Sequence, residues 1–285
     1  MLTMFYTEKQ SVATNASFSP SAGKPALVAN LFSKNPKVKP NWLVQPCTRP
    51  DIKLAHDPKY VDGILDLTIP NGFGNFSREV GQSLHWTTGS FYSAARFALK
   101  NKTVTFSPTS GFHHAEHNHG GGFCTFNGLM ITALLLKKFY DVKKVVIVDF
   151  DAHYGNGTDN IIKTLGLEGW VENYTFGWFA EVVKESTGGF DDWLDRLETY
   201  KLKEVIEGAD IVLYQAGADP HVDDPFGGYL TTSQMRRRDK LVFETANKLG
   251  VPLVWNLAGG YQQPIDKVLE LHNNTLEECI RAYGF

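Results

Sequence analysis

Apolar and polar positions follow two alternating patterns along much of the chain. Short, continuously apolar runs rich in β-branched residues are typical of strands inside a parallel sheet. Such strands are predicted at Thr103–Phe106, Lys144–Phe150, Asp210–Gln215 and Val251–Asn256. Polar residues and glycine follow each run, so we expect a loop at the carboxyl end of every strand.

Apolar residues at helical spacing separate these runs. We expect helices over Trp86–Lys100, Asn127–Tyr140 and, approximately, residues 192–206, 232–249 and 264–280. Strands that alternate with helices predict an α/β fold, with a mainly parallel sheet and helices on both of its faces.

Residues 16–50 have a different composition, rich in Ser, Pro, Asn and Lys. We expect a loop there, around one short apolar run at Ala26–Phe32. No repeat and no linker-like segment divides the chain, so we expect residues 1–285 to form a single domain.

The composition excludes several classes of protein. With 42% hydrophobic residues and a formal net charge of −3, the 285-residue chain is not expected to be disordered. It has no basic excess for binding nucleic acid. We expect its longest basic run, Arg236–Arg238, to be a solvated helix face.

The sequence predicts a soluble cytoplasmic protein without membrane contact. No apolar stretch approaches the roughly 18 residues of a transmembrane helix. Glu8 and Lys9 come too early for a signal peptide. The three cysteines are far apart and odd in number, which favours a reducing compartment over a disulfide framework. No pattern in the chain specifies an oligomeric state.

Polar side chains that can bind a metal ion follow two of the predicted strands. Asp149, Asp151 and His153 alternate after the apolar run Val145–Val148, and we expect them to share one face of an extended chain. Asp219 follows the strand at 210–215. Ligands bind beyond the carboxyl ends of parallel strands. Two carboxylates and one imidazole leave an open position on a tetrahedral zinc ion, although plain polar caps would produce the same spacing.

Two further fragments carry candidate proton donors and acceptors. His113 and His114 belong to a segment that holds four of the nine histidines. Adjacent imidazoles can transfer protons near neutral pH, and a surface metal-binding tract is the alternative. Tyr261 follows Gly259 and Gly260, where its phenol can donate a hydrogen bond to a developing oxyanion. A core tyrosine after a glycine turn is the alternative there.

Together, four segments resemble the histone deacetylase family, which also contains acetylpolyamine amidohydrolases and acetoin-utilisation proteins. The segments are Ser110–Gly128, Val148–Thr158, Gln215–Gly228 and Asn256–Tyr261. The resemblance implies the arginase–deacetylase fold and a zinc-dependent deacetylase. Its implied substrate is an acylated amine, such as acetyl-lysine, acetylpolyamine or a small-molecule amide, which loses an acetyl or other acyl group.

The resemblance also implies a role for individual residues. Asp151, His153 and Asp219 match the ligands of one zinc ion per chain. Asp149 matches the carboxylate that orients one histidine, and Asn156 stands where the second orienting group lies.

Three more residues match the groups that act on the substrate. His114 matches the general base and acid, and His113 matches its electrostatic partner. Tyr261 matches the tyrosine that stabilises the oxyanion, while His117 and His119 match no catalytic position.

The resemblance implies a substrate tunnel and a second cation as well. Phe123 and Gly122 match the wall of an acyl-lysine tunnel. A structural K⁺ ion is implied near Asp149, Asp151 and His153, with further contributions expected from Thr175 and Phe176.

Several positions depart from the family pattern. Phe112 stands where many relatives have Gly, and Tyr154 replaces a second His. Asn156 replaces an Asp, so it would orient His114 without a negative charge and stabilise its imidazolium less. No Asp occurs between Pro70 and Ser77, where a rim loop is expected.

Two alternatives stay open at this point. One is a dinuclear manganese ureohydrolase, although Gly155 occupies the place of the second Asp of its DAHxD motif. The other is a catalytically weak or non-enzymatic relative that binds acyl-lysine. His113, His114 and Tyr261 argue against it, because all three groups needed for turnover are present.

Overall fold

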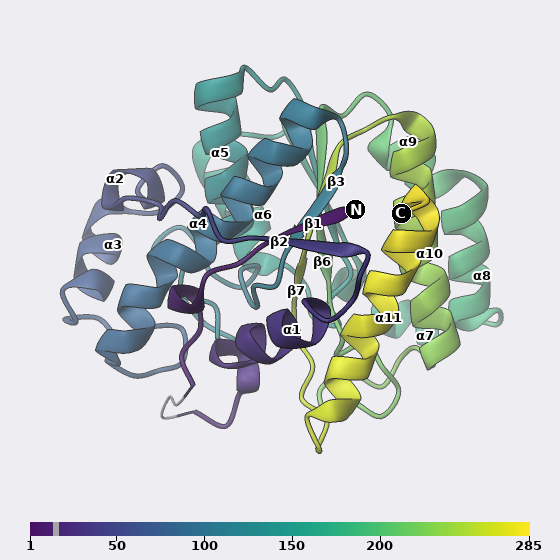
Figure 1. Cartoon of the computed structure of the whole chain (residues 1–285), viewed down its shortest axis with the longest axis horizontal. Helices are drawn as coiled ribbons and strands as arrows, with labels where there is room; N and C mark the ends of the chain where they lie inside the picture. The colour runs from purple at the N-terminus through teal and green to yellow at the C-terminus, as the bar shows by residue number, and fades with distance from the viewer. Residues whose placement is uncertain (14–16) are drawn as a thin grey trace.

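A seven-stranded sheet runs through the middle of the computed structural model, which describes residues 1–13 and 17–285 (Figure 1). All of its strand pairs are parallel, in the order β2-β1-β3-β7-β6-β4-β5. The strands are β1 (Leu2–Phe5), β2 (Val38–Asn41), β3 (Val104–Ser107), β4 (Val145–Asp149), β5 (Val171–Thr175), β6 (Ile211–Ala216) and β7 (Leu253–Leu257). The predicted α/β fold with a mainly parallel sheet is confirmed.

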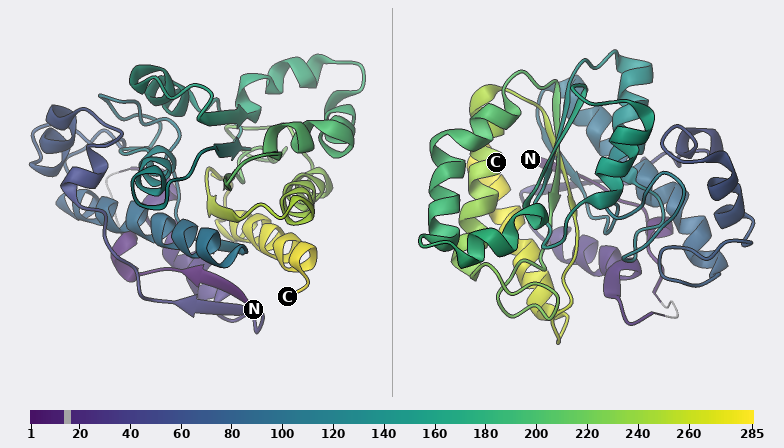
Figure 2. Two further views of the ribbon diagram at one scale, coloured as in Figure 1. Left: turned by 90° about the horizontal axis from the view of Figure 1, so that it is seen from above. Right: turned by 180° about the vertical axis from the view of Figure 1, so that it is seen from behind.

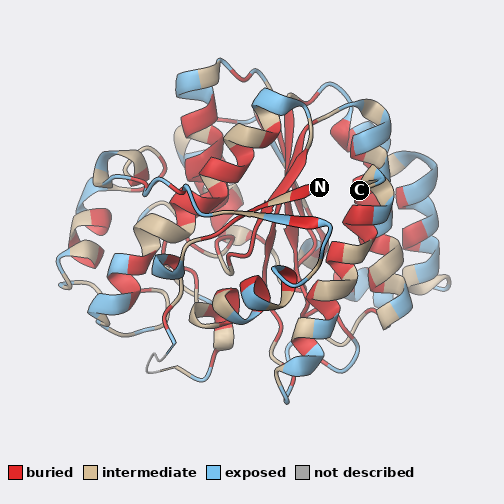
Figure 3. Cartoon of the chain, viewed as in Figure 1, coloured by how far each residue is buried: buried red, intermediate tan, exposed pale blue. Residues whose placement is uncertain are grey.

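The four predicted strands are the four central ones, β3, β7, β6 and β4. Every residue in them is buried (Figure 3), which explains their continuous apolar pattern. Their last residues are also in register. Asp149 pairs with Gln215, Gln215 with Asn256, and Asn256 with Ser107. The carboxyl ends of these strands therefore form one edge, where their loops meet.

The prediction of a loop over residues 16–50 is correct for residues 42–48 but wrong for much of the segment, and residue 16 lies outside the described residues. Helix α1 (Lys24–Phe32), the edge strand β2 and the short helix α2 (Arg49–Ile52) occupy this segment. Proline at the start of a helix is well tolerated because the first N–H groups have no intrahelical partner. Pro25 takes such a position in α1.

Helices cover both faces of the sheet, as predicted (Figure 2). One hydrophobic core joins one face of the sheet to α1, α8, α9, α10 and α11, and a second joins the other face to α2–α6. The remaining helices are α3 (Pro58–Leu65), α4 (Arg78–Asn101), α5 (Gly128–Tyr140), α6 (Asn156–Leu165), α7 (Ala180–Glu185), α8 (Gly189–Arg196), α9 (Leu202–Ile206), α10 (Thr232–Leu249) and α11 (Asp266–Tyr283).

The helix boundaries differ from the predictions at two places. Helix α4 begins eight residues earlier than the apolar pattern predicted, because the Ser77 side chain caps its polar first turn. The segment predicted as one helix at 192–206 consists of α8 and α9, which are joined by a short π-helical segment, Leu197–Lys201. Among the residues that the structure describes, no helix combines the length and the apolar character needed to cross a bilayer.

Candidate active site

The sequence-predicted metal ligands come together at the carboxyl edge of the central strands. His153 Nδ1 lies 3.0 Å from both Asp151 Oδ1 and Asp219 Oδ2. One ligand atom from each of the three residues lies within 4.8 Å of the others. Both carboxylates are buried, whereas the His153 side chain is 38% exposed. The group can hold a metal ion with its open side toward solvent.

Asp149, Asp151 and His153 do not share one face of an extended strand, because β4 ends at Asp149. Instead, the backbone N–H of Asp151 donates to Asp149 Oδ1 (3.3 Å), and that of His153 donates to Asp151 Oδ1 (3.0 Å). In each of these Asx turns, a carboxylate accepts from the N–H two residues later, and the turns bring Asp151 and His153 together.

The charges of the three residues favour a cation between the carboxylates. Hydrogen bonds that His153 donates to Asp151 and Asp219 raise its pKa to about 11. Burial, together with the charge of Asp151, raises the pKa of Asp219 to about 7. Two buried carboxylates side by side cannot both stay ionised without a compensating positive charge. A proton on His153 provides that charge here, and a divalent metal ion would provide more.

Glycines allow the backbone to approach these carboxylates closely. A Cβ at Gly259 would lie 2.2 Å from Asp219 Cγ, and one at Gly217 would lie 2.6 Å from Asp151 Cα. The N–H of Gly259 donates to Asp151 Oδ2 (2.9 Å), and that of Ala152 donates to Asp219 Oδ1 (3.3 Å). The loops after β4, β6 and β7 thus fix one another around the candidate metal ligands.

Two buried cations support these loops, and sequence reasoning missed both. Arg238 is completely buried, so the prediction of a solvated face for Arg236–Arg238 is wrong at this residue. Its Nη1 donates to the carbonyls of Phe150 and Gly217, both at 2.9 Å. Phe150 immediately precedes Asp151, and Gly217 lies two residues before Asp219. Arg238 therefore ties together the two loops that carry the carboxylates.

Lys24 is the second buried cation and belongs to the segment that was predicted as a loop. Its Nζ donates to the carbonyls of Ala258 and Gly259, the latter at 2.6 Å. Burial lowers the pKa of Lys24 to about 8, against the opposing effect of Asp219. Helix α1 in this way holds the loop that leads to Tyr261.

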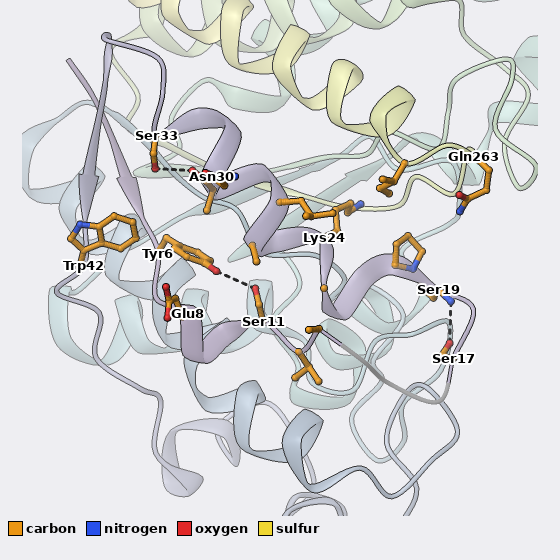
Figure 4. A pocket seen from close by; sticks show the side chains of 18 residues that line it. Tyr6, Glu8, Ser11, Ser17, Ser19, Lys24, Asn30, Ser33, Trp42 and Gln263 are labelled. Atoms are coloured by element: carbon orange, nitrogen blue, oxygen red, sulfur yellow. Dashed lines mark hydrogen bonds between the residues drawn. The ribbon is translucent and has the colours of Figure 1, made fainter.

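Lys24 also lines a cavity of about 1040 Å³ between the N-terminal segment and α1. Tyr6, Glu8 and Trp42 lie at one end of this cavity, and Gln263 lies at the other (Figure 4). None of the candidate metal ligands is among the described residues that line it, so we assign the chemistry to the edge of the sheet.

His113 and Asp149 form a buried pair next to Asp151, one of the candidate metal ligands. His113 Nδ1 donates to Asp149 Oδ2 (2.8 Å), whose other oxygen accepts from Gln215 Nε2 (3.0 Å). Burial lowers the pKa of His113, but the charges of Asp149 and Asp151 outweigh it and raise the pKa to about 9. The imidazole is therefore protonated at neutral pH.

His114 lies beside His113, with ring centroids 4.0 Å apart. Its Nδ1 lies 2.6 Å from Asn156 Oδ1, at the start of α6. Burial and the charge of His113 lower the pKa of His114 to about 4, so its imidazole is neutral. The backbone of Gly122 packs on this ring, because a Cβ there would lie 2.4 Å from His114 Cδ2.

The aromatic rings of Tyr261 and Phe123 lie next to each other. Their ring centroids are 5.9 Å apart, and Phe226 packs against Tyr261 at 5.0 Å. Phe18 and Phe73 extend the aromatic wall beyond Phe123. Burial and the charge of Asp219 raise the pKa of Tyr261 well above its ordinary value, so its hydroxyl keeps its proton.

The structure explains two of the departures from the family pattern. Phe112 has a φ of 135°, a conformation in which a bulky residue is strained and glycine is not. Its buried ring packs against Phe91 and fills the space over Gly128, where a Cβ would lie 2.3 Å from the ring. Tyr154 instead turns toward Trp178 and donates to Asp159 Oδ2 (2.5 Å).

The residues expected around a K⁺ ion also lie next to one another. Thr175 pairs with Asp149 across β4 and β5, and its Oγ1 accepts from the N–H of Gly155 (3.2 Å). Phe176 follows Thr175 and is buried. The other two histidines of the segment that holds His113 and His114 lie apart from this chemistry. His117 Nδ1 bonds the carbonyl of Ala55 (2.9 Å), and the His119 side chain is 60% exposed.

Comparison with known proteins identifies the family. The family model described as Histone deacetylase domain matches residues 23–166. The chain belongs to the histone deacetylase domain family. This match includes the two adjacent histidines and the loop after β4, whereas Asp219 and Tyr261 lie beyond it. Those two residues are connected to the site by the geometry above.

Three curated proteins are similar to this chain in sequence. An uncharacterized protein of Picosynechococcus sp. is 28% identical over 270 residues, which cover 87% of this chain and 88% of that protein. Histone deacetylase 2 of Arabidopsis thaliana is 31% identical over 56% of this chain and 44% of its own length. Acetoin utilization protein AcuC of Staphylococcus aureus (strain COL) is 28% identical over 70% of this chain and 59% of its own length.

A solved structure shows the same fold. The crystal structure of the HDA15 HD domain matches 99% of this chain and 89% of that chain, with a TM-score of 0.74 and 20% sequence identity. Together with the parallel sheet described above, this likeness supports the predicted arginase–deacetylase fold.

Proposed function

We propose that this chain is a zinc-dependent deacylase that hydrolyses an acyl amide to a carboxylic acid and an amine. Membership of the histone deacetylase domain family supports a deacetylase-type hydrolase. The observation that carries the finer proposal is the convergence of Asp151, His153 and Asp219 beside two adjacent histidines, His113 and His114.

The donor set fits one zinc ion per chain. Zinc accepts carboxylate oxygen and imidazole nitrogen, and catalytic zinc sites keep one position open for water or substrate. A zinc ion bound there would lower the pKa of water to about 7 and polarise the amide carbonyl. We also propose a structural K⁺ ion beside Asp149 and Thr175, which would stiffen the same loop.

In this proposal, His114 moves the proton. Because Asn156 Oδ1 accepts from Nδ1, the lone pair of Nε2 is free to take a proton from the attacking water. The water oxygen bonds to the carbonyl carbon. As the carbon–nitrogen bond then breaks, the same Nε2–H donates its proton to the leaving amine. The positive charge of His113 stabilises the negative charge that develops nearby.

In this proposal, Tyr261 stabilises the oxyanion. Its hydroxyl keeps its proton because of burial and the neighbouring Asp219. It can therefore donate a hydrogen bond when the carbonyl oxygen becomes negative. Phe123 and Gly122 would flank the chain that carries the amide, and we propose an acylated amine such as acetyl-lysine or acetylpolyamine as substrate.

A dinuclear manganese site is disfavoured by the space around Gly155. A Cβ at this position would lie 2.6 Å from Asp149 Oδ2. An additional carboxylate there, as a second metal ion requires, would have to displace Asp149 Oδ2 from its contact with His113.

The test combines turnover with metal content. The protein loaded with zinc is expected to hydrolyse a fluorogenic acetyl-lysine amide, to lose this activity with a chelator and to recover it when zinc is added back. Elemental analysis is expected to give one ion per chain, and the Asp219→Asn variant is expected to lose both metal and activity. Turnover that persists without metal, two ions per chain, or substrate binding without turnover would contradict the proposal.

A further inference from the structure

Asn156 lies between His114 and a carboxylate that the proposed mechanism does not use. Its Oδ1 lies 2.6 Å from His114 Nδ1, and its Nδ2 donates to Glu116 Oε1 at 2.9 Å. The Glu116 side chain is only 21% exposed. The chain of contacts therefore runs from the buried imidazole through the amide to the carboxylate.

The loop holds Glu116 in place independently of this contact. Its N–H donates to the carbonyl of His119 (2.9 Å), and its carbonyl lies 2.8 Å from Nδ1 of the buried His56. The other groups that face His114 are His113, His153 and Asp151. The Glu116 carboxylate also lies 3.6 Å from Nδ1 of the exposed His119, and its link to His114 runs through Asn156.

An amide is an ambiguous partner for a histidine, because its two ends have opposite hydrogen-bonding roles. With Oδ1 toward His114, Nδ1 must carry the proton and Nε2 is free to act as a base. With Nδ2 toward His114, the proton must move to Nε2, which is the wrong tautomer for catalysis. A carboxylate has no such ambiguity, because both of its oxygens accept.

We propose that Glu116 is a positioning residue that removes this ambiguity. A carboxylate accepts hydrogen bonds and donates none, so Glu116 requires the donor end of Asn156 to face it. The acceptor end must then face His114, which keeps the imidazole in the Nδ1–H tautomer. This role rests on the proposed function of His114 as the base.

The first experiment compares Glu116→Gln with the native protein, both loaded with zinc. A glutamine can accept from Asn156 or donate to it, so both orientations of the amide become available. We expect kcat to fall about tenfold or more, within the roughly 10⁴-fold cost of a wrong histidine tautomer, with little change in KM. Asn118→Ala is the matched control, because its exposed side chain lies against His119 rather than against Glu116 or Asn156, and its kcat is expected to stay at the native value.

A double-mutant cycle separates this role from a structural one. Asn156→Asp places two carboxylates against each other and is expected to lower kcat. Combining it with Glu116→Gln removes the repulsion and leaves an unambiguous acceptor at 156. The double variant is therefore expected to be more active than either single variant. Additive losses would overturn the proposal.

The tautomer itself can be measured without turnover. In protein labelled with ¹⁵N-histidine, the shifts of His114 are expected to report Nδ1–H in the native protein and a mixture in Glu116→Gln, with His114→Gln used for assignment. An unchanged tautomer in Glu116→Gln overturns the proposal. A changed tautomer in a protein that hydrolyses no amide would support the positioning role and reject the proposed function.

Discussion

The hydroxyl of Tyr261 is a hydrogen-bond donor over the working pH range, because burial and Asp219 keep its pKa high. Tyr261→Phe retains the ring that packs against Phe123 and Phe226 and deletes only this donor. Removing one oxyanion donor typically lowers kcat by about 10²–10³. We expect a fall of this size in steady-state assays, with unchanged zinc content. A fall of less than about tenfold would reject the oxyanion role.

The positions of single residues could be predicted from the sequence where they lie at the end of a strand or within a few residues of it. Asp149, Asp151 and Asp219 belong to this group, because the end of an apolar run shows where the sheet edge lies. Glu116 and Arg238 do not, since their partners lie 40 and 88 positions away along the chain. Arg238 and Lys24 also bind backbone carbonyls, which leave no trace in the residue pattern.

At the scale of elements, the central strands were predictable because the sheet buries both of their faces. The edge strands were not. β2 is short, contains Pro40 and is partly exposed, so it resembles a loop in composition. Helix α1 was missed because its apolar run is short and its first turn holds Lys24, a residue whose burial follows only from the carbonyls that it meets.

Helix α10 connects the proposed metal site to the rest of the protein through one side chain. Arg238 binds two carbonyls and also pairs with Asp239, which accepts from Thr275 of α11 (2.6 Å). Arg238→Lys keeps the charge for Asp239, but a single ammonium cannot reproduce the planar fork of hydrogen bonds. In this variant, the loops that carry Asp151 and Asp219 lose hydrogen bonds to their Phe150 and Gly217 carbonyls.

We expect Arg238→Lys to fold and to bind zinc about 10–100-fold more weakly, which is typical when a group that orients metal ligands is altered. Competition with a fluorescent zinc chelator measures this affinity. Arg237→Lys is the control on the same helix, because Arg237 pairs with Asp195 and Glu198 at the surface, where ion pairs contribute little. Equal zinc affinities in the two variants would contradict a role for Arg238 at the metal site.

At the scale of the whole molecule, three loops from distant parts of the chain meet around two buried carboxylates. The fold thus places like charges together at its carboxyl edge, and a cation there offsets their repulsion. A ligand that binds only the folded state stabilises it by about 2.7 kcal/mol at one hundred times its Kd. Chelation of the metal is therefore expected to lower Tm, by several degrees for a chain of this size.

The size of that decrease is expected to depend on pH. In the metal-free protein, folding raises the pKa of Asp219 from 3.8 to about 7 and that of His153 from 6.5 to about 11. When the pKa of a group is higher in the folded state, the folded protein loses stability as pH rises from the unfolded-state pKa to the folded-state pKa. Between about pH 6 and about pH 8, both groups act in the same direction, so the metal-free protein becomes less stable. Protons also compete less with the metal at higher pH.

Thermal unfolding with and without chelator should therefore show a larger difference in Tm at the higher pH, and Asp219→Asn should show little difference at either. An equal or smaller difference at the higher pH in the native protein would contradict a metal ion bound between Asp219 and His153.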